Sequence, residues 1–170
     1  MRWLALGMAA LALAGCARTP RPTPIPTGNG IASESISYET GPCFGSCPVF
    51  RVVVASDGTG TFTGIRNTAV SGERKFKLTA GQYAAFRDRL LPYMPQGSRQ
   101  DIRPGTPLCR QVATDLPSVE VNRTQAMRGA VQSHLYLYFG CDMDKNRAMA
   151  DALGNAPDVL PIGELIGERP

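Results

Sequence analysis

Residues 43–63, CFGSCPVFRVVVASDGTGTFT, place a cysteine pair, an apolar run and a turn in immediate succession. The run Val49 to Ala55 follows Pro48 at once and has the length and composition of a strand. Asp57-Gly58 is a strong hairpin signal, and Thr61-Phe62-Thr63 resumes the polar and apolar alternation beyond it. We therefore expect an antiparallel hairpin that begins directly after the two cysteines.

Two further strands flank this hairpin. Ser35-Ile36-Ser37-Tyr38 alternates polar with apolar residues and ends before Gly41-Pro42. Arg74 to Leu78 places Phe76 and Leu78 on one face and two lysines on the other. Three or four adjacent antiparallel strands follow from this pattern.

The period of the apolar residues changes at Thr79. Thr79-Ala80-Gly81-Gln82 fits a capping box, in which the threonine hydroxyl and the glutamine amide satisfy free groups at the start of a helix. Tyr83, Phe86 and Leu90 then recur at helical spacing, and Pro92 ends the element. We expect this helix to pack one apolar stripe on the sheet.

The second half of the chain repeats this logic. Four prolines and two glycines in residues 92–108 indicate an irregular loop. Later segments predict two more strands, a helix that Asp142 or Asp144 caps, and a last short helix. Their expected ranges are Ser118–Asn122, His134–Phe139, 142–155 and Pro161–Ile166. The predicted fold class is α+β: a mainly antiparallel sheet, one helix packed on it, short C-terminal helices and disulfide bonds.

The first 16 residues have the layout of a secretory signal. Arg2 supplies the positive start, Trp3 to Leu13 form an apolar run too short to span a bilayer, and Leu13-Ala14-Gly15-Cys16 follows. The tetrapeptide is similar to the lipobox of bacterial lipoproteins. The resemblance implies that residues 1–15 are a signal peptide, that Cys16 receives a diacylglyceryl group and that its new amino end is acylated. The alternative is a plain signal peptide cut near Ala14 or Ala17.

The residues after Cys16 carry the expectation for location. Ala17 stands where an aspartate commonly signals retention in the inner membrane of such lipoproteins, so the resemblance favours an outer-membrane anchor facing the periplasm. Prolines 20, 22, 24 and 26 favour extended polyproline II, and residues 16–32 are therefore interpreted as a lipidated tether. Residues 33–167 then form a single folded domain.

The charge of the chain restricts its partners. The formal net charge of +4 includes Arg2, so removal of the signal peptide leaves +3. No run of lysines interleaved with aromatic residues is present, which disfavours nucleic-acid binding. The expected partners are the membrane, through the lipid on Cys16, and an unidentified envelope protein or glycan.

The cysteine hexad carries a resemblance to a known family. Gly41 to Phe50, with the strand and the Asp57-Gly58 turn after it, resembles an exported bacterial domain family catalogued only as domain of unknown function 6438. The resemblance is specific in Cys-Phe-Gly-x-Cys-Pro and covers Ser33 to Leu90. It implies no established activity, substrate or catalytic residue.

Four cysteines remain after lipidation, and an even number in an exported domain indicates disulfides with three possible connectivities. We favour Cys43 with Cys47 and Cys109 with Cys141, because Gly45 lets a short ring turn. The alternative is thiol-disulfide exchange at Cys43 and Cys47, although redox motifs of the thioredoxin type have two intervening residues and a helix start. A zinc site from Cys43, Cys47, His134 and a fourth cysteine is a weaker hypothesis.

The remaining candidates for chemistry are few. His134 is the only histidine, and it lies in a predicted strand without a Gly-x-Ser-x-Gly elbow anywhere. Its face also carries Tyr136 and Tyr138, which would offer an aromatic surface to a partner or a glycan if they were exposed. Five acidic residues are expected at turns or exposed positions, with no feature that places two around one cleft: Glu34, Glu39, Asp57, Glu73 and Asp88.

One metal motif is rejected. Residues 142–146 copy the first positions of a calcium loop, but Arg147 stands where the loop requires glycine, and Leu153 stands where it requires a bidentate glutamate. The sequence thus predicts no metal, no cofactor and no catalytic residue. We expect an outer-membrane lipoprotein that acts as a non-enzymatic binding or structural module. The alternatives are a redox protein using Cys43 and Cys47, and a hydrolase acting on cell-wall or lipid material through a site assembled from scattered residues, which a deep polar pocket around His134 would favour.

Overall fold

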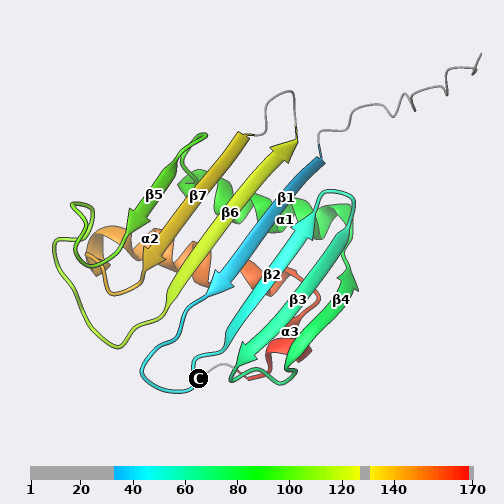
Figure 1. Ribbon diagram of the computed structural model, residues 1–170, viewed down its shortest axis with the longest axis horizontal. Coiled ribbons are helices and arrows are strands. Elements are labelled where there is room, and N and C mark those ends of the chain that lie inside the picture. Colours follow the sequence, from blue (N-terminus) through cyan, green and yellow to red (C-terminus); the bar gives the residue numbers. More distant parts are fainter. Residues whose placement is uncertain (1–32, 127–130, 169–170) are drawn as a thin grey trace, which may run out of the picture. The chain divides into compact units, whose positions relative to one another are not determined.

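The computed structural model describes residues 33–126 and 131–168. The expected signal peptide, Cys16 and the tether lie outside these ranges. The described residues form one seven-stranded sheet in the order β4-β3-β2-β1-β6-β7-β5 (Figure 1). The strands are β1 (Ser33–Thr40), β2 (Val49–Ala55), β3 (Thr59–Arg66), β4 (Gly72–Lys77), β5 (Arg99–Ile102), β6 (Ser118–Ala126) and β7 (Val131–Tyr138).

The first four strands form the expected antiparallel meander. Tyr38 lies opposite Val52 across β1 and β2, and Val52 lies opposite Phe62 across β2 and β3. These three side chains share one face of the sheet, and each is at most 1% exposed. The other edge of β1 pairs with β6 over its whole length, from Ser33 opposite Ala126 to Thr40 opposite Val119. The two halves of the chain therefore join in one continuous sheet.

The prediction of an irregular loop over residues 92–108 is wrong in part. Leu91–Tyr93 form a 3₁₀ turn, η1, and Arg99–Ile102 form strand β5, which pairs with β7 in parallel. Ile102 is the one apolar residue of this strand, and it is buried. A four-residue strand with a single core position has no usable alternation, so the prolines and glycines around it dominate the sequence pattern.

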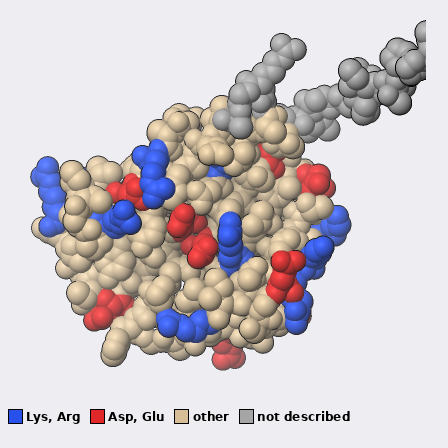
Figure 2. All heavy atoms as spheres, in the orientation of Figure 1, with Lys and Arg blue, Asp and Glu red and all other residues tan. Residues whose placement is uncertain are grey.

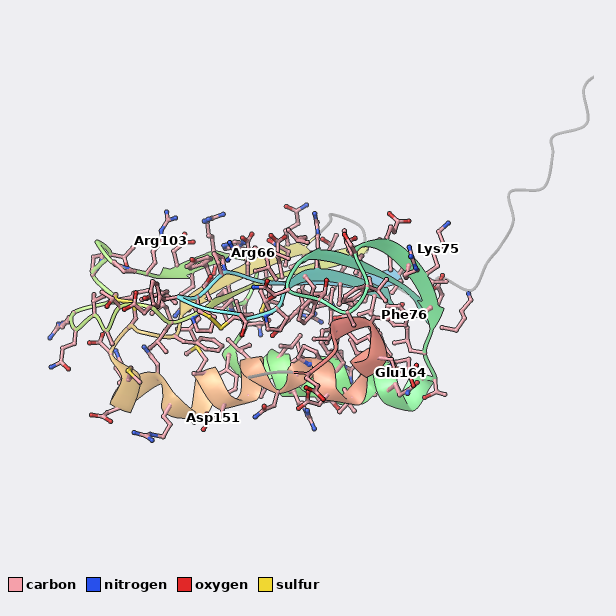
Figure 3. All side chains as sticks on the ribbon, turned by 90° about the horizontal axis from the view of Figure 1, so that it is seen from below. Arg66, Lys75, Phe76, Arg103, Asp151 and Glu164 are labelled. Atoms are coloured by element: carbon pink, nitrogen blue, oxygen red, sulfur yellow. A yellow bond between two sulfur atoms is a disulfide. The ribbon has the colours of Figure 1, made fainter. Side chains whose placement is uncertain are left out.

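All helices lie on one face of the sheet and leave the other face open (Figures 1 and 3). Helix α1 (Ala80–Leu90) begins with the predicted capping box, since the Gln82 amide donates to the Thr79 hydroxyl and the Thr79 amide donates to the Gln82 side chain. Its buried stripe of Tyr83, Phe86 and Leu90 is also as predicted. This stripe packs on the apolar face of the sheet, where Phe86 contacts Tyr38 edge-to-face.

Helix α2 (Met143–Gly154), the 3₁₀ turn η2 (Ala156–Val159) and helix α3 (Gly163–Ile166) complete the helical layer. Asp142 takes the N-cap position of α2, as predicted, but its side chain makes no capping hydrogen bond. Ile162 and Ile166 are buried as predicted. No helix in the described part of the chain is long and apolar enough to cross a membrane.

Candidate functional site

The four described cysteines form the two favoured disulfides, Cys43–Cys47 and Cys109–Cys141. The two bridges together use all four described cysteines, so none of them is the free thiol that the zinc hypothesis required. Within the described residues no group of three or more metal-ligating side chains is gathered. The two bridges differ in their surroundings: Cys43 and Cys47 are half-buried, whereas Cys109 and Cys141 are 8% and 0% exposed.

The Cys43–Cys47 bridge closes a short ring in the connection between β1 and β2. Gly45 has φ +133°, a conformation that favours glycine, although open space surrounds its α-carbon. One backbone hydrogen bond joins the ring to the loop before β6, from Phe44 N–H to Asp115 O at 3.1 Å. A second, from Gly41 N–H to Ser118 O at 2.7 Å, joins the chain just before the ring to the start of β6. The ring is therefore closed by its disulfide and attached to the neighbouring loop at Phe44.

Phe44 projects from this ring into solvent. Its exposed fraction is 86%, and the other large apolar side chains that are exposed in the described residues range from 37% to 53%. Isolated exposed apolar residues are common on protein surfaces. A largely exposed phenyl ring on a covalently closed loop is better suited to binding, because the loop backbone has little conformational entropy to lose when a partner covers it.

A small apolar pocket lies beside the ring, on the helix side of the sheet. Its volume is about 180 Å³. Its walls come from the ends of β1, β2 and β6, the residue after β7 and the last residue of α2: Tyr38, Thr40, Cys47, Pro48, Phe50, Pro117, Ser118, Val119, Phe139 and Gly154. None of these residues is charged. The pocket therefore suits an apolar group of the size of one side chain.

The Thr40 hydroxyl joins the end of β1 to the backbone just after the ring. It donates to Pro48 O at 2.8 Å and accepts from Phe50 N–H at 3.0 Å. Tyr38 forms part of the pocket wall. Its hydroxyl donates to Leu153 O at 3.0 Å, which joins β1 to α2. These contacts join the sheet end, the ring and α2, so the pocket walls are held by three separate elements.

The second bridge fastens the long loop before β6 to the start of α2. Asp142 adds to this attachment: its carboxylate accepts from the backbone N–H groups of Arg110 at 3.0 Å and Gln111 at 2.8 Å. These two hydrogen bonds lower the pKa of Asp142 below its ordinary value. The residue adopts a left-handed conformation with φ +40°. Its carboxylate thus clamps the loop, which explains why it makes no capping hydrogen bond to α2.

His134 lies on the open face of the sheet in a polar cluster with residues of β5 and β6. Its Nδ1 is 2.8 Å from Asn122 Oδ1, and its Nε2 is 3.4 Å from Asp101 Oδ1. The Glu120 carboxylate is 3.6 Å from Nδ1. The hydrogen bond from Arg99 lowers the pKa of Asp101, and His134 adds to this effect. Among the described residues, the imidazole thus contacts amide and carboxylate oxygens and no hydroxyl or thiol nucleophile.

His134 is 8% exposed and lines one side of a polar hollow of about 370 Å³. Ser133, its neighbour in the chain, also borders this hollow, and its hydroxyl accepts from Gly97 N–H at 3.1 Å. The Arg103 guanidinium lies 6.0 Å from the centre of the Tyr136 ring, and Tyr136 and Tyr138 are both half-buried. This surface mixes positive and negative side chains along the sheet (Figure 2). The aromatic surface that the sequence suggested is therefore partly covered.

A buried ion pair lies between the sheet and α1. Arg123 of β6 donates to Glu34 of β1, and their side chains are 14% and 10% exposed. The expectation that Glu34 is exposed or at a turn is therefore wrong. Tyr83 packs beside this pair, and burial, followed by the charge of Glu34, raises its pKa well above the ordinary range. We interpret the pair as structural, because the two opposite charges are paired with each other between β1, β6 and α1.

The sequence pointed to the cysteine pair, and Phe44 appeared there only as part of the family motif. It did not indicate the pocket, because the walls come from segments between Tyr38 and Gly154 that meet only when the sheet and α2 are assembled. The cluster around His134 was likewise hidden, since β5 was not predicted as a strand.

The family model described as Domain of unknown function (DUF6438) matches residues 34–155. The matched range contains both disulfides, the ring and all of the pocket. No curated protein matches the chain.

Proposed function

The chain belongs to the family DUF6438, and we propose that it is a lipid-anchored protein of the outer membrane. In this proposal it acts as a non-enzymatic binding module, which presents the Cys43–Cys47 ring to a periplasmic partner. The observation that carries the proposal is the 86% exposed Phe44 on a closed ring beside an apolar pocket. Aromatic side chains on rigid loops are typical anchors of interfaces.

The path of β1 supports this arrangement. The expected tether joins the domain at Ser33, where β1 begins, and the ring follows Thr40, where β1 ends. Eight residues of strand span about 26 Å, so the ring lies at the end of the strand remote from the tether. A binding surface placed there remains accessible while the lipid is held in the membrane.

The environment of His134 supports a non-enzymatic role. Its contacts with Asn122 and Asp101 keep the ring in a fixed orientation on the sheet, and the Ser133 hydroxyl accepts from a backbone N–H. A nucleophile activated by histidine requires hydrogen-bond contact between the two groups.

A redox protein is the second candidate, and one observation favours it. The Cys43–Cys47 bridge is half-buried while the other bridge is buried, so a reductant reaches the first more readily. However, Cys47 also lines an uncharged apolar pocket, where a thiolate is poorly stabilised. The ring leads into β2 and lacks the helix start that lowers thiol pKa in redox motifs.

The anchor and the binding surface are tested in the same cells. We expect labelled palmitate to enter the protein and to be absent from Cys16→Ala. A photo-crosslinking amino acid in place of the exposed Ser46 should give a discrete product, which should disappear in Phe44→Ala. Burial of a phenylalanine is worth about 2 kcal/mol, so its loss weakens binding roughly 30-fold. The same probe in place of Asp88, exposed on α1, is the matched control.

Absence of palmitate would refute the anchor. A product that forms equally from position 88, or that survives Phe44→Ala, would refute the ring as the binding surface. For the redox candidate, disulfide mapping by mass spectrometry in a graded thiol buffer is decisive. Opening of Cys43–Cys47 at a mildly reducing potential, with Cys109–Cys141 intact, would favour redox chemistry instead.

A further inference from the structure

The exposed Phe44 lies on the ring that contributes Cys47 to the wall of the apolar pocket. Phe44 follows Cys43, and Cys47 and Pro48 form part of the pocket wall. The disulfide holds the α-carbons of the two cysteines 5.7 Å apart. The projecting side chain and the pocket are therefore two features of one surface, and their relative positions are fixed by a covalent bond.

The pocket has the size and chemistry to accept a phenyl ring. Its volume is about 180 Å³, and apolar protein cavities of about 150 Å³ bind benzene. Its aromatic walls, Tyr38, Phe50 and Phe139, allow edge-to-face or offset contacts with an inserted ring. Phe44 cannot be the occupant within its own molecule in this structure, since it is 86% exposed.

A surface that carries both a projecting group and a matching pocket is complementary to itself. Under two-fold symmetry each copy inserts its projecting group into the pocket of the other, and both contacts form at once. Residues 41–48 contain no charged side chain, and neither does the pocket wall. The inserted group and the walls that receive it therefore carry no charge, although the exposed Asp115 lies next to the ring, where its backbone oxygen accepts from Phe44 N–H.

We propose that the pocket binds Phe44 of a second copy of this chain, so that two copies pair through two reciprocal insertions of Phe44. This inference rests on the proposed function and identifies the partner of its binding surface. It assigns the pocket as the receiving site and Phe44 as the group received.

The area involved sets the strength of the pairing. An aromatic side chain buries about 150 to 250 Å². Two insertions bury about 300 to 500 Å² of phenylalanine surface, and the small pocket walls add less than this, whereas a stable interface needs about 1,200 Å² or more in total. The pair is thus weak between free molecules. Anchoring both copies to one membrane raises their effective concentration, and pairing is favoured there.

The test uses the full lipidated chain in cells, with two copies that carry different tags and a photo-crosslinking amino acid in place of Ser46 in both. We expect a product of twice the chain's mass that carries both tags. Phe44→Ala should reduce it at least tenfold. Gly154→Leu should do the same from the other side, because a side chain there starts 3.5 Å from the Phe139 ring and fills the pocket. Gly163→Leu is the matched control, since open space surrounds Gly163.

Each outcome decides between the hypotheses. The doubly tagged product, lost in Phe44→Ala and Gly154→Leu but retained in Gly163→Leu, supports reciprocal pairing. A product that contains only a different protein overturns the pairing and leaves the proposed binding function intact. A doubly tagged product that survives Gly154→Leu also overturns it, because the pocket is then not the receiving site. No product at all overturns both proposals.

Mixing the two variants gives an independent check. A Phe44→Ala copy keeps its pocket, and a Gly154→Leu copy keeps its projecting phenyl ring. Co-expression of these two copies restores one of the two insertions, so we expect the doubly tagged product to return in part. Failure of this mixture to exceed either variant alone would contradict the reciprocal geometry.

Discussion

Removal of each disulfide should lower the unfolding free energy of the domain, and the structure predicts which removal costs more. The bridges join cysteines that are 4 and 32 positions apart. In the chain-entropy model, loops of these lengths contribute about 2 and about 4 kcal/mol, because the longer loop restricts the unfolded chain more. Cys109 and Cys141 are also buried, so their removal leaves unfilled volume in the core.

We therefore expect Cys109→Ala/Cys141→Ala to lose at least about 4 kcal/mol of unfolding free energy, and Cys43→Ala/Cys47→Ala to lose about 2 kcal/mol. The assay is urea unfolding of a lipid-free form that carries Cys16→Ser, followed by fluorescence and circular dichroism. Equal losses, or a larger loss for the ring of residues 43–47, would refute the argument from loop length and burial. Such a result would mean that the ring stabilises the folded state through contacts beyond its covalent closure.

Three further predictions concern groups that the structure places in the fold. Arg123→Ala leaves the Glu34 carboxylate buried without its partner, and we expect a loss of about 3 kcal/mol in urea unfolding; a loss below 1 kcal/mol would contradict a buried pair. The pKa of Asp142 is lowered, so the stabilisation from its ionised form is present above its ordinary pKa of 3.8 and is lost as the pH falls through the lowered folded-state value. The protection factors of the two amides that donate to it, corrected for the intrinsic exchange rate at each pH, should fall there, and unchanged protection factors would refute the clamp. Gly140→Ala would place a β-carbon 2.0 Å from Ala113 O, so we expect a loss of about 2 kcal/mol in thermal or urea unfolding, and a neutral result would show that this loop moves freely.

Local sequence patterns predicted those elements whose cause is local. The capping box at Thr79 and Gln82 formed as expected, because both partners of its hydrogen bonds lie within one turn. The Asp57-Gly58 turn joins β2 to β3, and Gly58 has the positive φ of +82° that such a turn requires. The Cys43–Cys47 ring was also foreseeable, since its closure depends on a glycine between the two cysteines.

Predictions failed, in whole or in part, where a group found a distant partner. Asp142 has the residue type of a helix cap, but its carboxylate bonds to backbone groups of a loop 31 and 32 residues earlier. Glu34 has the residue type of an exposed position, but it meets Arg123 across the β1 and β6 pair. Strand β5 has one buried residue and becomes a strand only through its parallel pairing with β7.

The sequence by itself determined most of the strands and helices, the helix start at Thr79, the short disulfide ring and the membership in DUF6438, because each rests on residues close together in the chain. Only the tertiary structure decided the strand order, the exposure of Phe44, the pocket beside it and the polar cluster around His134. The physical reason is separation: Tyr38 and Gly154 become two walls of one pocket only when β1 pairs with β6 and α2 packs beneath the sheet.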